Sequence, residues 1–169
     1  MEKRHITVFD FDGTLTRDDT FLSFARHALP VRRLIAGSLR SLDTLIAWKT
    51  GRITNSAAKE RIYSALYKEL DRKAIEKAAA TFRPRYREEI LSALKKLRDE
   101  GQEVIIVTAS LDLWMNEIAR SLGVRVLCTE TSTAPDGTLT GHFSTPNCHG
   151  PEKVARLRQA VPDLASCHL

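Results

Sequence analysis

The chain has 169 residues, a net charge of +5 and a sequence pI near 9.3, with 43% hydrophobic and 28% charged residues. This size allows one core domain with a modest insertion, and the composition excludes a disordered chain. No run approaches the roughly 20 apolar residues of a membrane span, and residues 1–5 lead into a strand-like run rather than a signal-peptide core. A basic surface favours anionic partners, although the same charge arises where Lys and Arg only solvate exposed helices.

The first predicted element is a strand over 6–9, which ends at the acidic loop 10–13, Asp-Phe-Asp-Gly. The next segment, 18–85, contains no convincing strand, and its apolar residues follow helical spacing. These residues include Phe21, Phe24, Leu34, Leu42, Leu45, Ile46, Ile62 and Leu66. We interpret this segment as a helical insertion between the first strand and the rest of the sheet.

The remaining chain alternates helices and strands. Helical spacing predicts helices over 86–100 and 111–122, each closed by a glycine. Short β-branched runs predict strands over 104–107 and 124–128. This alternation is typical of an α/β fold, in which crossover helices flank a parallel sheet.

Two features follow the last of these strands. Asp136-Gly137, between threonine-rich flanks, predicts a tight hairpin turn. Gly150-Pro151 then predicts the start of a helix that carries Val154 and Leu157 inward.

The three cysteines, Cys128, Cys148 and Cys167, are odd in number and form no Cys-x-x-Cys pair. We therefore expect reduced thiols in a cytoplasmic protein rather than a disulfide scaffold. The pairs Cys148-His149 and Cys167-His168 have no matching second half at zinc-finger spacing, so no zinc site is expected.

Chemistry is predicted at the end of the first strand, where ligands bind in open parallel sheets. Asp10 and Asp12 are two crowded anions, and a hard divalent cation such as Mg²⁺ would neutralise them through oxygen ligands. The same cation can clamp a phosphate oxygen and leave one carboxylate free to attack phosphorus. Gly13 lets backbone N–H groups of the following turn approach the phosphate.

At this point the chain resembles a known family. The heptapeptide 10–16, Asp-Phe-Asp-Gly-Thr-Leu-Thr, is similar to the first signature of the haloacid dehalogenase superfamily, whose members are mostly phosphatases. Thr108 resembles the second signature and Lys153 the third. The runs 110–113 and 147–153 are similar to the phosphoserine-phosphatase-like subfamily, which also carries a helical cap after the first signature.

This resemblance implies a Rossmann-like parallel sheet flanked by helices, with a helical cap inserted after the first strand. The core domain is then expected over 1–17 and 86–169, and the cap over 18–85. The family also has a fourth signature, an acidic loop after a further strand, which completes the metal site. Because the chain stops at Leu169 and Asp163 lies too early, the core is expected to lack its C-terminal part; a longer protein and impaired metal binding both stay open.

The resemblance assigns roles to individual residues. Asp10 would be the nucleophile that forms an aspartyl-phosphate, and Asp12 the general acid–base. Mg²⁺ would be held by the Asp10 carboxylate and the Asp12 backbone carbonyl. Thr108 and Lys153 would stabilise the phosphoryl charge. Further phosphate contacts are expected from Gly13, Thr14 and Ser110.

The leading hypothesis is therefore a magnesium-dependent phosphatase acting on a small phosphorylated metabolite or on a lipid phosphate. The alternative is a degenerate, non-catalytic module that binds a phospholigand or a protein. The basic, amphipathic segment 31–49 could contact an anionic membrane surface, although a plain cap helix is favoured. No nucleic-acid motif is present, so nucleic acid is not an expected partner, and the sequence carries no signal of the oligomeric state.

Four aromatic residues near these motifs are expected to have structural roles. Trp48 and Trp114 are predicted to be packing residues rather than platforms for a substrate. His142 and His149 are expected to be structural or solvated.

Overall fold

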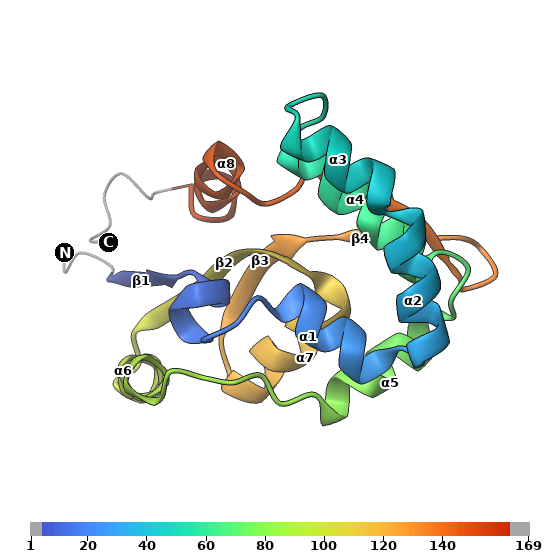
Figure 1. Cartoon of the computed structure of the whole chain (residues 1–169). Coiled ribbons are helices and arrows are strands. Elements are labelled where there is room, and N and C mark those ends of the chain that lie inside the picture. The colour runs from blue at the N-terminus through green and yellow to red at the C-terminus, as the bar shows by residue number, and fades with distance from the viewer. Residues whose placement is uncertain (1–4, 163–169) are drawn as a thin grey trace.

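Three parallel strands form the sheet that carries the predicted site (Figure 1). In this computed structural model, which describes residues 5–162, the strands are β1 (Ile6–Phe9), β2 (Glu103–Leu111) and β3 (Arg125–Thr129). Their order is β1–β2–β3, and both pairings are parallel. The predicted parallel sheet is confirmed, although β2 runs past the predicted end to Leu111, with a register shift against β3 after Val107.

Helices cover both faces of this sheet. Those of the core are α6 (Glu88–Asp99), α7 (Asp112–Leu122) and α8 (Pro151–Ala160). Val104 and Ile106 of β2 belong to a large core shared with α6 and α7, and the alternate residues Ile105 and Val107 face a smaller core with α8. Burial on both faces explains why β2 is continuously apolar rather than alternating. In Figure 1, α8 lies above the sheet, and α6 and α7 lie below it.

The segment 18–85 is helical, as predicted. It forms α1 (Thr20–Ala28), α2 (Val31–Arg40), α3 (Leu42–Lys49), α4 (Asn55–Tyr67) and α5 (Arg72–Thr81). Side chains of Asp19, Thr54 and Asp71 accept hydrogen bonds from the first turns of α1, α4 and α5, which satisfies N–H groups that a helix leaves unpaired. The division into separate core and cap domains stays a prediction, because one buried cluster joins residues of both.

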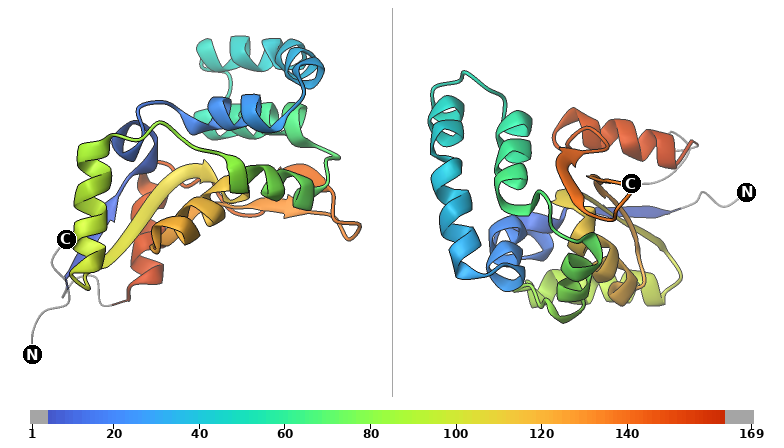
Figure 2. Two further views of the ribbon diagram at one scale, coloured as in Figure 1. Left: turned by 90° about the horizontal axis from the view of Figure 1, so that it is seen from below. Right: turned by 90° about the vertical axis from the view of Figure 1, so that its right-hand side faces the viewer.

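The outer layer of the cap is formed by α2 and α3, which lie farthest from the sheet in both views of Figure 2. α2 approaches α4 closely at Gly37, where an added Cβ would lie 2.5 Å from Leu66 Cδ2. Arg33 Nε donates to the Leu66 carbonyl at 2.7 Å. These contacts fix which face of α2 is turned toward the cap interior.

The predicted hairpin turn is confirmed. It joins β4 (Thr131–Thr133) to β5 (Leu139–Phe143), which are antiparallel. Gly137 has φ +88°, a conformation that favours glycine, and Asp136 Oδ1 accepts from the Thr138 amide at 2.9 Å. The hairpin packs against α4, where Phe143 stacks on Tyr63, so it links the core to the cap.

The predicted helix after Gly150 is also confirmed, but the prediction for one of its residues is wrong. Leu157 is buried, whereas Val154 is 48% exposed. Leu157 of α8 and the following Val161 pack in the small core with Ile105 and Val107 of β2, whereas Val154 is not part of that core. Within residues 5–162, no helix combines the length and the apolar composition of a membrane span. Asp163, Cys167 and His168 lie outside the described residues.

Candidate active site

The wide helical turn Phe11–Leu15 follows β1 and carries the first signature. Phe11 and Leu15 are completely buried and anchor the turn in the core, while Asp10 and Gly13 are exposed. Gly13 has φ +77°, and no heavy atom lies within 4 Å of an added Cβ. Glycine is therefore required here by the backbone conformation rather than by a lack of room.

Asp10 and Lys153 form an ion pair at the mouth of this turn. Lys153 Nζ lies 2.8 Å from Asp10 Oδ2, and the two side chains are 25% and 44% exposed. The other carboxylate oxygen, Oδ1, accepts from the Phe11 amide at 2.7 Å. Lys153 belongs to the first turn of α8, so the structure brings the first and third predicted signatures into direct contact.

The Asp12 carboxylate is held by hydroxyl groups rather than by a cation. Its Oδ1 accepts from the Thr20 amide at 2.9 Å and from Thr20 Oγ1 at 2.7 Å. Ser110 Oγ donates to Oδ2 at 2.5 Å. The buried indole of Trp114 donates to Thr20 Oγ1 at 3.2 Å, which confirms the packing role predicted for Trp114.

Thr108 lies beneath the site. It is 1% exposed, and its hydroxyl accepts from the Ser110 amide at 3.0 Å. Ser110 is also buried, but it reaches Asp12 directly. The roles of Thr108, Ser110, Gly13 and Thr14 in binding a phosphoryl group stay predictions, and none of the four lines the cavity described next.

A cavity of about 780 Å³ lies between the cap and the carboxyl end of the sheet. Its polar lining includes Asp10, Asp12, Lys59, Asn147, His149 and Lys153. Its apolar lining comes from the cap: Phe21, Leu22, Leu42, Leu45, Trp48, Ala58, Ile62 and Leu66. The cavity therefore has a charged end at β1 and an apolar wall opposite.

Lys59 and Trp48 were not assigned to the site from the sequence, but both line the cavity. Lys59 Nζ donates to the Ala109 carbonyl at 2.7 Å; burial lowers the pKa of Lys59, and the nearby carboxylates of Asp12 and Asp19 oppose this shift. The sequence does contain a signal for Lys59: it is spaced i, i+3, i+7 with Ile62 and Leu66, which places a lysine on the apolar face of a helix. Trp48 is 43% exposed and lines the cavity, so its predicted packing role is not confirmed. It lies on the outer helix α3.

The residues at this end of the sheet fit a Mg²⁺ ion with few protein ligands. Among residues 5–162 there is no group of three or more His, Cys, Asp or Glu that could hold a metal. Mg²⁺, however, is commonly bound by one or two carboxylates together with water and substrate phosphate. The partly exposed Asp10 carboxylate and the Asp12 carbonyl supply oxygen donors of this kind.

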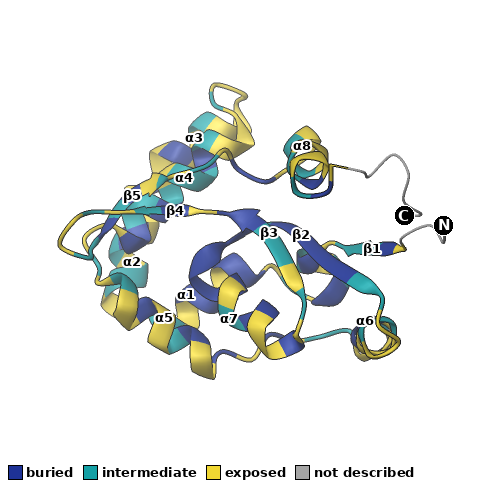
Figure 3. Ribbon diagram, turned by 180° about the vertical axis from the view of Figure 1, so that it is seen from behind, coloured by how far each residue is buried: buried dark blue, intermediate teal, exposed yellow. Residues whose placement is uncertain are grey.

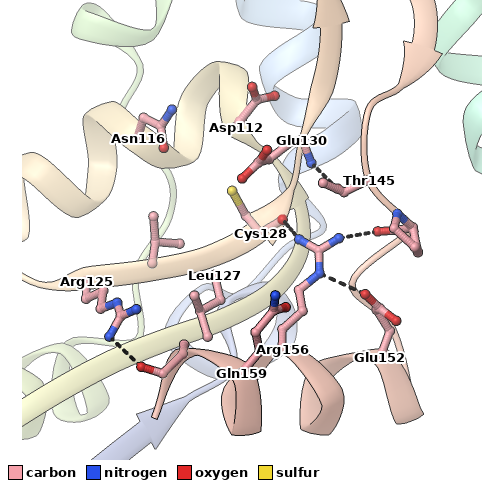
Figure 4. A pocket seen from close by; sticks show the side chains of 13 residues that line it. Asp112, Asn116, Arg125, Leu127, Cys128, Glu130, Thr145, Glu152, Arg156 and Gln159 are labelled. Atoms are coloured by element: carbon pink, nitrogen blue, oxygen red, sulfur yellow. Dashed lines mark hydrogen bonds and ion pairs between the residues drawn. The ribbon is translucent and has the colours of Figure 1, made fainter. Parts of the chain in front are cut away.

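A second cavity, of about 680 Å³, lies between β3, α7 and α8 (Figure 4). The Arg156 guanidinium donates to the carbonyls of Cys128 and Pro146 and pairs with Glu152. Arg125 donates to the Ala160 carbonyl at 3.2 Å. Burial raises the pKa of the Cys128 thiol, which disfavours the nucleophilic thiolate. Arg125 and Arg156 in this cavity bind carbonyl and carboxylate groups of the chain itself. We therefore place the active site in the first cavity.

Comparisons with known proteins agree with this geometry. Residues 7–167 match the family described as haloacid dehalogenase-like hydrolase. Protein CicA of Caulobacter vibrioides is 33% identical over 166 residues, which cover 94% of this chain and 74% of CicA. The phosphoserine phosphatase of Methanocaldococcus jannaschii is 25% identical over 140 residues, covering 83% of this chain and 62% of that protein.

A solved structure described as a phospho-aspartyl intermediate analogue of phosphoserine phosphatase shares the fold, with a TM-score of 0.66 and 22% identity. The match covers 99% of this chain and 75% of that one. The chain thus spans only about half to three quarters of solved chains that share its fold. Because the family match covers nearly the whole chain, and the predicted signature residues Asp10, after β1, and Lys153, on α8, are in contact, this chain belongs to the haloacid dehalogenase-like hydrolases and resembles phosphoserine phosphatases.

Proposed function

We propose that this protein is a magnesium-dependent phosphatase that transfers the phosphoryl group of a monoester through Asp10. The observation that carries the proposal is the contrast between two adjacent carboxylates. Asp10 pairs with the ammonium of Lys153 at 2.8 Å, whereas the Asp12 carboxylate accepts hydrogen bonds from the hydroxyl and amide of Thr20 and from the hydroxyl of Ser110. The phosphoserine phosphatase names of a relative and of a solved structure support the same reaction class.

In the first step, an Asp10 carboxylate oxygen attacks phosphorus, and the bond from phosphorus to the ester oxygen breaks. The leaving oxygen takes a proton from Asp12, which acts as the general acid. The Ser110 hydroxyl can stay hydrogen-bonded to Asp12 in both steps, because a hydroxyl group donates to an ionised carboxylate and accepts from a protonated one. Lys153 offsets the charge that Asp10 and the phosphoryl group bring together.

In the second step, Asp12, now ionised, accepts a proton from water as that water attacks phosphorus. The bond between phosphorus and Asp10 breaks, inorganic phosphate leaves, and both side chains return to their starting states. Bound Mg²⁺, held by the Asp10 carboxylate and the Asp12 carbonyl, would polarise a phosphoryl oxygen. We further propose that Thr108, Ser110 and the turn at Gly13-Thr14 bind phosphoryl oxygens.

The proposed substrate is a small phosphorylated metabolite or a lipid phosphate, and nucleic acid is not a proposed partner. We also propose a cytoplasmic location, since Cys128 and Cys148 are free thiols. The second candidate function is a non-catalytic module that binds a phospholigand. It is favoured by the lack of a three-residue metal cluster among residues 5–162.

The test is hydrolysis of a generic aryl phosphate with and without Mg²⁺. We expect Mg²⁺-dependent turnover that Asp10→Asn lowers by roughly 10³-fold or more, because the nucleophile is lost. Asp99→Asn is the matched control, since that carboxylate is 65% exposed on α6. Equal activity of Asp10→Asn and the wild type would refute the proposal. Inactivity of the wild type, with phosphate binding retained, would favour the non-catalytic module.

A further inference from the structure

The large exposed apolar side chains of the described residues are concentrated on three helices of the cap. Nine large hydrophobic residues are exposed within the described residues, and only Val154 lies outside α1–α3. The other eight, which we name the cap apolar patch, are Leu22, Val31, Ile35, Leu39, Leu42, Leu45, Ile46 and Trp48. Figure 3 shows exposed residues along α2 and α3. Large contiguous apolar surfaces are rare on monomeric proteins and mark interaction sites.

The fold turns this patch outward. Arg33 and Gly37 hold one face of α2 against α4. Val31, Ile35 and Leu39, spaced i, i+4, i+8, lie on the opposite face and are 57–70% exposed. On α3, Leu42, Leu45, Ile46 and Trp48 are also exposed. This helix forms the outer layer of the cap with α2 (Figure 2).

The charge around the patch is strongly positive. Between residues 20 and 52 there are six Lys or Arg residues and a single acidic residue, Asp43. All but Arg33 of the basic residues are exposed: Arg26, Arg32, Arg40, Lys49 and Arg52. Exposed apolar side chains on the same helices as exposed Lys and Arg, with a Trp among them, are typical of helices that lie in the interface of an anionic membrane.

The charge disfavours a second copy of the chain as the occupant. A two-fold interface brings the same surface of both copies together, so these basic residues would face one another and repel. An anionic lipid surface satisfies both the apolar side chains and the charges. No helix of residues 5–162 could span the membrane, so such contact would be peripheral.

The patch is continuous with the active-site cavity. Leu22, Leu42, Leu45 and Trp48 belong to the patch and also line the cavity that contains Asp10. A phosphate bound at Asp10 would therefore have an apolar wall beside it that leads to the patch.

We propose that α1–α3 dock on an anionic lipid bilayer and open the cavity toward a phosphate monoester that carries hydrocarbon chains. The choice of substrate rests on the proposed phosphatase function, whereas the docking does not. The patch binds the acyl region, the exposed arginines and Lys49 bind lipid phosphates, and the apolar wall accepts the part of the substrate next to its phosphate.

Co-sedimentation with vesicles tests the docking directly. We expect the wild type to bind phosphatidylcholine vesicles containing phosphatidylglycerol about tenfold more strongly than pure phosphatidylcholine, with binding that weakens as salt rises. Ile35→Ser/Leu39→Ser/Ile46→Ser should lose binding about tenfold or more, because three apolar anchors are removed. Val154→Ser is the matched control and should bind like the wild type. Circular dichroism verifies that each variant is folded.

Catalytic assays separate the two parts of the proposal. None of the three substituted residues lines the cavity, so the triple variant should hydrolyse a soluble aryl phosphate like the wild type. Its hydrolysis of phosphatidic acid in vesicles should fall about tenfold, in line with binding. Vesicle binding without any hydrolysis would defeat the phosphatase function and leave the docking in place.

Two results would overturn the docking itself. The first is equal vesicle binding by the wild type and the triple variant, including no binding by either. The second is a wild-type dimer in light scattering that the triple variant converts to a monomer, without vesicle binding, because a second copy would then cover the patch.

Discussion

Thr20→Val removes a hydroxyl group from the middle of the network around Asp12 and changes the shape of the side chain little. Thr20 Oγ1 donates to Asp12 Oδ1 at 2.7 Å and accepts from Trp114 Nε1 at 3.2 Å. Thr20 is 1% exposed and Trp114 is completely buried, so water cannot replace the lost partner. The substitution therefore removes one charge-assisted hydrogen bond and leaves a buried indole N–H without an acceptor.

The expected loss of stability follows from these two effects. A hydrogen bond to a charged group contributes about 1.5–3 kcal/mol, and an unsatisfied buried donor costs about 1–3 kcal/mol. Asp12 keeps the Thr20 amide and Ser110 Oγ as donors, which places the first effect at its low end. We therefore expect the free energy of unfolding to fall by about 3 kcal/mol, and Tm by roughly 6–12 °C for a chain of this size.

Urea unfolding followed by tryptophan fluorescence measures this loss, since Trp114 is itself part of the network. Thr50→Val is the matched control: its hydroxyl donates to the Ile46 carbonyl on an exposed surface, and a change within about 0.5 kcal/mol is expected. If Thr20→Val were as stable as the Thr50→Val control, the reasoning that water cannot replace the lost hydroxyl would be refuted.

Two further predictions concern burial elsewhere in the fold. Arg72→Met leaves Asp112, whose side chain is 8% exposed, without its guanidinium partner at 2.6 Å. Because Arg72 is itself 22% exposed, we expect the free energy of unfolding in urea to fall by about 2–3 kcal/mol. The exposed control Glu76→Gln should lower it by less than about 1 kcal/mol. Burial raises the pKa of the Cys128 thiol above 9.0 and that of Tyr63 from 10.0 to about 12. The unfolded chain therefore binds fewer protons than the folded one above about pH 9 at Cys128 and above about pH 10 at Tyr63. In each window stability should fall by up to about 1.4 kcal/mol per pH unit. Urea midpoints at pH 8 and 10 measure this slope; a slope that Cys128→Ala leaves unchanged between pH 9 and 10 would count against the assignment to Cys128.

Much of the fold follows from local patterns. Residues 104–107 are apolar without alternation, which is typical of a strand buried on both faces, and the structure confirms this for β2. The turn at Asp136-Gly137 and the start of α8 at Pro151 depend on the backbone preferences of a few neighbouring residues, so they were predictable. The inward position of Val154 was not, because the helical pattern alone does not say which line of side chains meets the sheet.

Some residues of the candidate site could be identified from the sequence, and others only from the structure. Asp10, Asp12 and Lys153 were identified from short motifs, and the structure brings Asp10 and Lys153 into an ion pair. The positions of Lys59 and Thr20 in the site were not predicted, because their partners lie far along the chain. Thr20 contacts Ser110, 90 residues away, and Lys59 contacts Ala109, 50 residues away.

The sequence by itself determined the family, the strand that delivers Asp10 and the helical nature of the cap, since each depends on residues within a few positions of one another. Tertiary structure alone decided which side of the cap is covered. Helical spacing shows that Val31, Ile35 and Leu39 share a face, but burial depends on where the neighbouring helix packs. Here α4 packs at Gly37, on the opposite face of α2, and the apolar stripe is left exposed beside the cavity.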